Sequence, residues 1–223
     1  MSKLFLVPTP IGNLKDITYR AVEVLGEAEL ILAEDTRQAK KLLTRYNISA
    51  PVKSHHMFNE HKTVESICDK IASGIRVALI SDAGTPGISD PGYLLARACI
   101  DRGLPVESLP GATALIPALV SSGLPSDRFI FEGFIPVKKG RNKRIEAIAE
   151  EKRTIILYES PYRIVKTLED LGFILGSDRE ASVSRELTKV FEETIRGSLS
   201  FLTGYFKENK PRGEFVIVVS GKK

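Results

Sequence analysis

Short apolar runs alternate with helical hydrophobic patterns between residues 4 and 120 of this chain. The runs have the length of buried strands, and the segments between them repeat apolar residues with the helical period. The order strand then helix occurs five times in succession. Because a parallel pair of strands needs a crossover connection, usually a helix, this alternation favours a mostly parallel sheet with helices on both faces.

The elements expected in this half follow from that pattern. The expected strands are Leu4–Val7, Leu30–Ala33, Val52–Met57, Arg76–Ile80 and Val106–Leu109. The expected helices are a segment through Ile17, Ala21, Val24 and Leu25, followed by Thr36–Tyr46, Thr63–Ala72, Tyr93–Asp101 and Ala112–Val120.

The pattern changes after about Ser122, where Gly123 and Pro125 interrupt the chain and the strand spacing becomes less regular. Further strands are expected at Arg128–Phe131, Thr154–Tyr158, Ala181–Ser184 and Phe215–Val219. Further helices are expected at Arg144–Glu151, Ile164–Leu171, Thr188–Ile195 and Leu199–Phe206. At roughly 150 residues per domain, the 223 residues fit two small domains. We predict domains at residues 1–121 and 122–223.

The composition is that of a soluble globular protein, with 43% hydrophobic and 27% charged residues. No stretch approaches eighteen uninterrupted apolar residues, and the run Leu4–Val7 is too short for a signal peptide. Cys68 and Cys99 lie in separate helical patterns, which excludes a disulfide framework and a cysteine-rich zinc site. We therefore expect a cytoplasmic protein of a reducing compartment.

Three common site motifs are missing. No two of the 17 glycines stand at i and i+2, which excludes the G-x-G turn of dinucleotide folds and disfavours the Rossmann-type methyltransferases. The segment Gly87–Gly92 approaches a P-loop, but Tyr93 stands where the phosphate-binding lysine is needed. His55, His56 and His61 do not form H-E-x-x-H and are interpreted as structural or surface residues, so no metal is predicted.

Glycine-rich and charged segments directly follow six of the expected strands. They are Pro8–Asn13, Glu34–Arg37, Ser81–Gly92, Pro110–Ala114, Tyr158–Arg163 and Ser184–Lys189. Each alone has a structural interpretation, since Pro and Gly end strands and Thr36 or Asp90 can cap a helix. Together they predict a ligand site, because ligands of open parallel sheets bind at the carboxyl ends of the strands.

The motifs PTPIGNL, AEDTR, SDAGTPGISDPG, PGATA, YESPYR and SRELTK occur in this order over nearly the whole chain. In this respect the chain resembles the ribosomal RNA small-subunit methyltransferase I branch of the tetrapyrrole methylase superfamily. The tetrapyrrole-specific branch instead opens with a G-x-G-P-G-D type of loop, where this chain has Pro8–Asn13. The resemblance departs in one place, because members continue into a short helical segment after the last strand, expected here to end at Val219.

The resemblance implies two α/β domains, with a mostly parallel sheet in the first, a mixed sheet in the second and S-adenosylmethionine bound in the cleft between them. It further implies a homodimer that methylates the 2′-oxygen of a cytidine ribose in the decoding region of 16S rRNA, in the small ribosomal subunit. The cofactor residues carried over from the family are Ile11, Gly12, Asp82, Gly84, Thr85, Ile88, Gly111, Ala112, Tyr158, Pro211, Gly213 and Glu214. Asp82 also has a structural interpretation as a turn cap.

A ribose hydroxyl is a poor nucleophile, and a positioned base contributes about 10² to 10⁴ in rate. We expect Glu34 or Asp35 to orient or deprotonate the hydroxyl while Arg37 holds the adjacent phosphate. The same mixture of charges also fits structural ion pairs.

The segment 138–144 contains five basic and no acidic residues, Lys138, Lys139, Arg141, Lys143 and Arg144, so the net charge of +4 is concentrated there. Cations at the start of a helix face the unfavourable end of its dipole unless an anion also binds. We expect this segment to contact RNA phosphates together with Arg163, Arg185 and Lys189, a solvated loop being the structural alternative. Two further functions stay open: C-methylation of a precorrin or uroporphyrinogen, and non-catalytic RNA binding in ribosome assembly.

Overall fold

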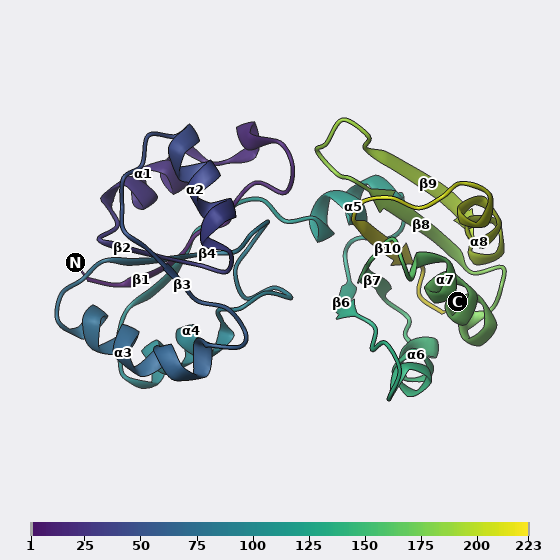
Figure 1. Ribbon diagram of the computed structural model, residues 1–223. Helices are drawn as coiled ribbons and strands as arrows, with labels where there is room; N and C mark the ends of the chain where they lie inside the picture. Colours follow the sequence, from purple (N-terminus) through teal and green to yellow (C-terminus); the bar gives the residue numbers. More distant parts are fainter. Residues whose placement is uncertain (1, 223) are drawn as a thin grey trace. The chain divides into compact units, whose positions relative to one another are not determined.

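A computed structural model describes residues 2–222 of the chain (Figure 1). The chain divides between Thr113 and Ala114 into two compact units, called unit 1 and unit 2 below in chain order. Each unit contains one five-stranded sheet. Within the described residues, no helix combines the length and the apolar character needed to cross a lipid bilayer.

Unit 1 is built on a sheet with the strand order β3-β2-β4-β1-β5, in which every neighbouring pair is parallel. The strands are β1 (Leu4–Leu6), β2 (Leu30–Ala33), β3 (Val52–Ser54), β4 (Val77–Ile80) and β5 (Val106–Ser108). The helices are α1 (Tyr19–Glu27), α2 (Thr36–Arg45), α3 (Glu60–Ala72) and α4 (Tyr93–Asp101), with a short 3-10 turn η1 (Leu14–Asp16) before α1. The parallel sheet predicted from the alternation is confirmed.

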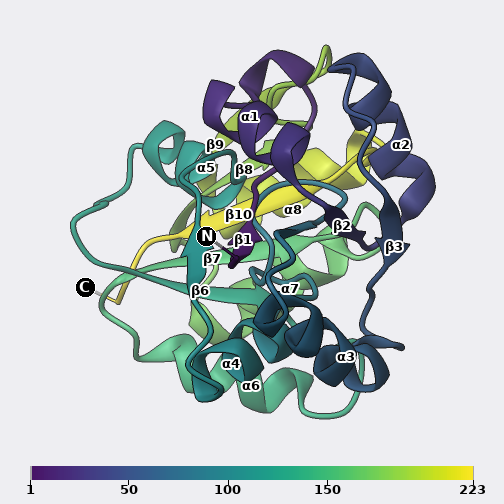
Figure 2. The ribbon, with the colours of Figure 1, turned by 90° about the vertical axis from the view of Figure 1, so that its left-hand side faces the viewer.

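The period-two alternation of the strands divides the core of unit 1 into two layers. In β1 and β2, Phe5 and Ile31 point to the face covered by α1 and α2, whereas Leu4 and Leu32 point to the face covered by α3 and α4. Figures 1 and 2 show these two helix pairs on opposite sides of the sheet. Because both faces are covered, the strand edges and the loops that follow them carry the polar side chains of the unit.

Unit 2 contains a mixed sheet with the order β6-β7-β10-β8-β9. The pair β6–β7 is parallel and the other three pairs are antiparallel. The strands are β6 (Phe129–Phe134), β7 (Thr154–Glu159), β8 (Glu180–Arg185), β9 (Glu193–Ser198) and β10 (Phe215–Val219). The helices are α5 (Leu115–Ser122), α6 (Arg141–Ala149), α7 (Ile164–Leu175) and α8 (Leu199–Glu208). The expected mixed sheet of the second domain is confirmed.

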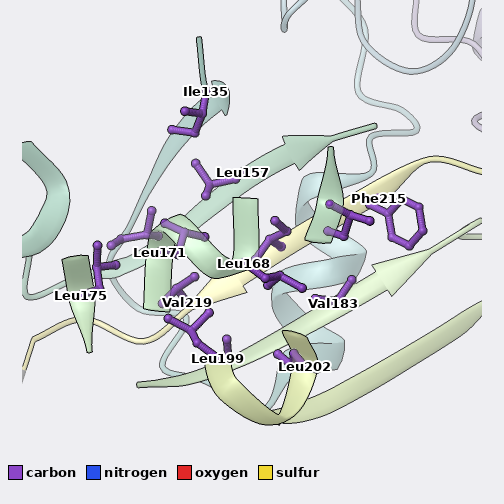
Figure 3. Packing of buried hydrophobic residues seen from close by; sticks show 14 of the residues in the cluster. Ile135, Leu157, Leu168, Leu171, Leu175, Val183, Leu199, Leu202, Phe215 and Val219 are labelled. Atoms are coloured by element: carbon purple, nitrogen blue, oxygen red, sulfur yellow. The ribbon is translucent and has the colours of Figure 1, made fainter. Parts of the chain in front are cut away.

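One face of this sheet packs on α6, α7 and α8. Figure 3 shows Leu168 and Leu171 of α7 and Leu202 of α8 in one layer with Val183 of β8 and Phe215 of β10, with Leu171 beside Leu175. All of these side chains are buried. Every residue of β10 is buried, as the continuous apolar sequence of that strand predicts.

The opposite face of the same sheet packs on α5. Ala118 and Leu119 of α5 are buried, and the Arg196 Nε–H of β9 donates to the Ser121 carbonyl oxygen at 2.9 Å. Helix α5 therefore belongs to unit 2, and the division falls between residues 113 and 114, eight residues before the expected boundary.

The helix expected at Thr188–Ile195 is wrong. Residues 186–192 form the turn of a hairpin and β9 follows as an antiparallel partner of β8, with Arg185 opposite Glu193. Glu186 and Thr188 have positive φ angles of 50° and 68°, which a helix does not allow. The long-range pairing with β8 thus overrides the helical pattern of the local sequence.

Candidate functional site

The carboxyl ends of all five strands of unit 1 lie at one edge of the sheet, because the strands are parallel. The loops after β1, β2, β4 and β5 therefore meet there, and these loops carry the unit 1 residues that the sequence predicts for the site. This region is the carboxyl edge of unit 1.

Two of these loops are joined by a short antiparallel bridge between Thr9 and Gly84, with both N–H···O distances at 2.9 Å. Hydroxyl groups reinforce it: Thr9 Oγ1 donates to the Ser81 carbonyl at 3.0 Å, and Ser81 Oγ donates to the Gly84 carbonyl at 3.0 Å. Thr9 and Ser81 are buried. The loops after β1 and β4 are thus fixed to each other by backbone and side-chain hydrogen bonds.

Glycines allow a third loop to approach these two. A Cβ atom on Gly84, whose φ is +81°, would lie 3.4 Å from Ile11 Cγ2 and 3.7 Å from the Ala112 carbonyl oxygen. A Cβ atom on Gly111 would lie 2.6 Å from Pro8 Cβ, which is closer than real Cβ atoms approach. The loops after β1, β4 and β5 therefore pack against one another at Gly84 and Gly111, and this region is called the glycine junction.

The rest of the loop after β4 runs close to the sheet. Thr85 Oγ1 donates to the Ala112 carbonyl at 3.0 Å, and the Ile88 N–H donates to the Thr85 carbonyl at 3.3 Å. Gly92 has a φ of +135°, and a Cβ atom there would lie 2.9 Å from Leu79 Cδ2. These contacts bring Ile11, Asp82, Gly84, Thr85, Ile88, Gly111 and Ala112 to the carboxyl edge, with Gly12 next to Ile11.

Glu34 and Asp82 follow the neighbouring strands β2 and β4. Partial burial raises the pKa of Glu34 above its usual value of 4.5, and the carboxylates of Asp82 and Asp35 raise it further, whereas His56 lowers it. Asp82 Oδ1 accepts a hydrogen bond from the Asp35 N–H at 3.0 Å. Glu34 is therefore a carboxylate of increased basicity at the carboxyl edge.

Asp35 has a different environment. Its side chain caps α2 by accepting from the Arg37 N–H at 2.8 Å, and Arg37 Nη2 lies 2.7 Å from Asp35 Oδ2. These hydrogen bonds lower the pKa of Asp35 to about 2. Arg37 is itself largely exposed. The structural ion pair that the sequence left open for these two residues is present.

A cavity of about 260 Å³ lies between the carboxyl ends of β1 and β4 and helix α2. Ile80 and Leu42 form part of its apolar wall, and Gln38, Lys41 and Asp82 contribute polar groups. The sequence analysis missed Gln38 and Lys41. Their spacing of three residues on α2, directly after the charged segment at Glu34–Arg37, was the available signal.

In unit 2, the predicted cofactor residues Tyr158 and Glu214 lie at the ends of paired strands. The Tyr158 ring makes edge contacts with Phe131 and Phe134, with ring centroids 4.8 and 5.8 Å apart. Pro211, Gly213 and Glu214 precede β10, and a Cβ atom on Gly213 would overlap the carboxylate of Glu186.

That carboxylate belongs to a small ion cluster. Lys189 Nζ lies 2.9 Å from both Glu186 Oε1 and Glu214 Oε2, and the Glu214 N–H donates to Glu186 Oε1 at 3.1 Å. Glu186 and Lys189 thus bind the loop before β10 to the end of β8.

The predicted phosphate-binding residues fall into two groups. Lys138, Lys139 and Lys143 are exposed. Four others are ion-paired within unit 2, namely Arg144 with Glu132, Arg163 with Glu159, Arg185 with Glu193 and Lys189 with Glu186 and Glu214.

Arg141 differs from the rest of the segment because it is buried. Its Nε lies 2.7 Å from Asp170 Oδ2, and its Nη groups donate to Thr167 Oγ1 at 2.8 Å and to the Pro136 carbonyl at 3.2 Å. As a correction to the sequence expectation, this guanidinium is directed into the fold of unit 2 and is not part of an exposed cationic surface.

Comparison with known proteins bears on this arrangement. Residues 3–203 match the model of the Tetrapyrrole (Corrin/Porphyrin) Methylases. The chain belongs to this family. Among curated tetrapyrrole methylase relatives, the Synechocystis protein named Ribosomal RNA small subunit methyltransferase I is 51% identical, over 99% of this chain and 80% of the relative. The protein of the same name from Thermotoga maritima is 46% identical over the full length of both chains.

Solved structures of a uroporphyrin-III C-methyltransferase and of a diphthine synthase share the fold at low sequence identity. The uroporphyrin-III C-methyltransferase from Thermus thermophilus complexed with S-adenyl homocysteine has a TM-score of 0.67 and 18% identity, over 99% of this chain and 97% of that one. A diphthine synthase has a TM-score of 0.77 and 17% identity, over 100% of this chain and 91% of that one. The expected fold class, distinct from that of Rossmann-type methyltransferases, is confirmed.

Proposed function

We propose that this tetrapyrrole methylase transfers a methyl group from S-adenosylmethionine to the ribose 2′-oxygen of a cytidine in the decoding region of 16S rRNA. The observation that carries the proposal is the close similarity, over nearly the whole chain, to relatives named for methylation of small-subunit ribosomal RNA. The carboxyl edge of unit 1 supplies both the glycine junction, where main-chain groups lack covering side chains, and a carboxylate of raised pKa.

The residues at the carboxyl edge fit the methyl donor. Gly84 carries no side chain and lies beside the Ile11 side chain and the Ala112 carbonyl oxygen, so a ligand can approach main-chain groups directly. When bound, S-adenosylmethionine would supply an electrophilic methyl group on a positively charged sulfur. The proposed donor residues are Ile11, Gly12, Asp82, Gly84, Thr85, Ile88, Gly111 and Ala112 of unit 1 and Tyr158, Pro211, Gly213 and Glu214 of unit 2.

Glu34 is the proposed general base. The raised pKa of its carboxyl makes the ionised form a stronger proton acceptor, whereas Asp35, with a pKa of about 2, is a weak one. Glu34 would accept the proton that the ribose 2′-hydroxyl loses as its oxygen becomes methylated. Asp35 would hold α2 and the Arg37 guanidinium in place, and Arg37, exposed on one side, would contact the adjacent phosphate.

The exposed lysines at the start of α6 are the proposed docking groups for the RNA backbone. Lys138, Lys139 and Lys143 lie around the amino terminus of that helix, where the backbone N–H groups also favour an anion. Arg144, Arg163, Arg185 and Lys189 already have carboxylate partners, so their contribution to phosphate binding would be smaller.

The test is transfer of a labelled methyl group to small ribosomal subunits that lack the modification, followed by mapping of the modified ribose. Label on a single cytidine 2′-oxygen is the expected result. Transfer to a precorrin or uroporphyrinogen but not to RNA would instead identify a tetrapyrrole C-methyltransferase. Absence of donor binding in calorimetry would identify a non-catalytic RNA-binding protein.

The proposal includes a homodimer that acts in the cytoplasm. Buried thiols at Cys68 and Cys99 fit a reducing compartment. Light scattering coupled to size-exclusion chromatography should give about twice the 24.6 kDa mass of the chain.

A further inference from the structure

The cavity between β1, β4 and α2 lies on a different side of the carboxyl edge from most of the proposed donor residues of unit 1. The glycine junction involves the loops after β1, β4 and β5, whereas the cavity is closed by α2, which follows β2. In the sheet order, β2 and β5 are separated by β4 and β1. The glycine junction and the cavity therefore share only the loops after β1 and β4.

Some polar groups of the cavity form hydrogen bonds within the protein, and others can bind a ligand. The hydroxyl groups of Thr9 and Ser81 donate to backbone carbonyls within the loops. Gln38 Oε1 accepts from Lys41 Nζ at 3.1 Å. The Gln38 amide NH2 group and the remaining protons of the Lys41 ammonium group are then the donors of this pair. Asp82 accepts one hydrogen bond at Oδ1, and its other carboxylate oxygen is an acceptor. The cavity thus presents donors on α2 and an acceptor after β4.

We propose that this cavity receives the cytosine base of the acceptor nucleotide, an inference that rests on the proposed function. Cytosine carries an amino group that donates, beside a ring nitrogen and a carbonyl that accept, and carboxylates are known to accept from this amino group. Asp82 lies in a loop that the cavity shares with the glycine junction. In this inference its carboxylate accepts from the amino group of the base instead of contacting the methyl donor, and Gln38 and Lys41 donate to the other two positions. Uracil places a carbonyl where cytosine has the amino group, so it would face the Asp82 carboxylate with the wrong polarity.

The volume and the position of the cavity fit a single nucleobase. The volume of about 260 Å³ is below the roughly 300–1,000 Å³ of pockets that enclose drug-sized ligands, and the apolar wall of Ile80 and Leu42 suits the faces of a flat ring. Proteins that read RNA sequence bind unstacked bases by their hydrogen-bonding edges in this way. Glu34 and Asp82 follow the neighbouring strands β2 and β4, and the Asp35 N–H donates to Asp82 Oδ1 at 3.0 Å, so a base held at Asp82 would bring its ribose toward the proposed general base.

The first experiment compares two neighbouring lysines of α2. Lys41 lines the cavity, whereas Lys40 is an exposed residue outside it, so Lys40→Ala is the matched control for Lys41→Ala. Methyl transfer is measured on small subunits whose rRNA carries cytidine or uridine at the mapped position. For Lys41→Ala and Gln38→Ala, kcat/KM on the cytidine substrate should fall about tenfold, the effect of losing one good base contact. The Kd for S-adenosylmethionine, measured by calorimetry, should not change.

A second variant tests the direction of base selection. In Asp82→Asn the amide can donate to a uracil carbonyl, so the preference for cytidine over uridine should fall about tenfold or more. The same preference in Asp82→Asn as in the unchanged protein would overturn the inference. A tenfold loss of donor affinity in Lys41→Ala or Gln38→Ala would also overturn it, since the cavity would then belong to the donor. No methyl transfer by the unchanged protein to either RNA would instead overturn the proposed function, and the inference with it.

Discussion

Each of the two units contains a five-stranded sheet, but the strand directions differ between them. Unit 1 has parallel strands, so its strand ends and polar loops gather at one edge, where Glu34 and Asp82 are partly or fully accessible. Unit 2 has a mixed sheet, and its charged side chains near strand ends are engaged with each other, as in the pairs Arg163–Glu159 and Arg185–Glu193.

This difference shows in which unit carboxylates can stay without an ion-pair partner and so be accessible to a ligand. In unit 1 the loops are fixed by backbone bridges and glycine contacts, so Glu34 and Asp82 need not form ion pairs to hold the structure, although Asp35 pairs with Arg37. In unit 2 a buried network of Arg141, Asp170, Thr167 and Glu159 fixes the loops by side-chain contacts. We therefore expect substitutions of charged residues to affect mainly the rate in unit 1 and mainly the stability in unit 2.

The largest effect is expected for Glu34→Gln. Loss of a positioned base should lower kcat on the small-subunit substrate by about 10² to 10⁴, with unchanged donor affinity. Asp35→Asn is the control, because asparagine also caps helices and the Asp35 pKa of about 2 makes it a weak base. Full turnover by both variants would show that no base lies in this segment.

Because the Glu34 pKa is raised, the rate of the unchanged protein should decline with falling pH at a value above 4.5.

The matching change in unit 2 is Arg141→Met. It leaves Asp170 buried with only Lys166, 2.7 Å away, as its cation. Removal of one partner of a buried pair costs about 3 to 5 kcal/mol, and we expect the lower end because Lys166 remains. Lys143→Met, on the same helix but exposed, should change the free energy of unfolding by less than about 0.5 kcal/mol. Urea denaturation measures both, and equal stability of the two variants would contradict the buried network.

Acidification should reveal a buried histidine at the carboxyl end of β3. Burial, with a smaller contribution from His56, lowers the pKa of His55 from 6.5 to about 4, and its neighbours Thr63 and Glu60 lie 3.0 and 3.9 Å from its ring nitrogens. Between these pH values the unfolded chain binds a proton that the folded protein does not. Stability should therefore fall by up to about 3 kcal/mol as the pH decreases from 6.5 to 4. His55→Asn should flatten this part of the pH dependence, and an unchanged slope would contradict the assignment.

Gly111→Ala tests the close approach of the loops in unit 1. The added Cβ would meet the rigid Pro8 ring at 2.6 Å, and such overpacking costs about 1 to 3 kcal/mol. Gly26→Ala on α1 has no atom within 4 Å of the new Cβ and should stabilise the protein by up to about 1 kcal/mol. Thermal unfolding should thus move in opposite directions for the two variants, whereas a shift in the same direction would argue against the tight contact.

The smallest effect is expected for Lys138→Gln combined with Lys139→Gln. Loss of two phosphate contacts should reduce RNA affinity by less than about tenfold and lower the slope of log Kd against log salt by roughly 1.5. The control is Lys53→Gln combined with Lys152→Gln, which removes the same charge from two other exposed positions. Equal salt slopes for both double variants would assign the effect to net charge and not to the segment before α6.

Much of the fold could be predicted because the local patterns and the tertiary structure agree. The strand Leu30–Ala33 and the helix Tyr93–Asp101 have the predicted bounds. In both, burial of the apolar residues determines the local pattern as well as the tertiary packing. The hairpin at residues 186–192 could not be predicted, because β9 is stabilised by pairing with β8 and not by its own sequence.

In the candidate site too, residues placed by long-range contacts could not be predicted from the local sequence. Glu34 and Asp82 were found because they directly follow strands. The burial of Arg141 had no local signal, because its partner Asp170 is 29 residues away and its neighbours in sequence are all surface residues. Gln38 and Lys41 resemble any exposed face of an amphipathic helix until the neighbouring loops are placed around them.

The interior position of β1 between β4 and β5 in the parallel sheet has a consequence for the order of assembly. Leu4–Leu6 is synthesised first, yet its partners are β4, in register at Val77, and β5, at Val106. Closing such long loops is entropically costly and slow, whereas β8 and β9 form a hairpin across one short turn. During translation the first apolar strand can therefore pair with β4 only after residues 77–80 have left the ribosome, and with β5 only after residues 106–108 have done so.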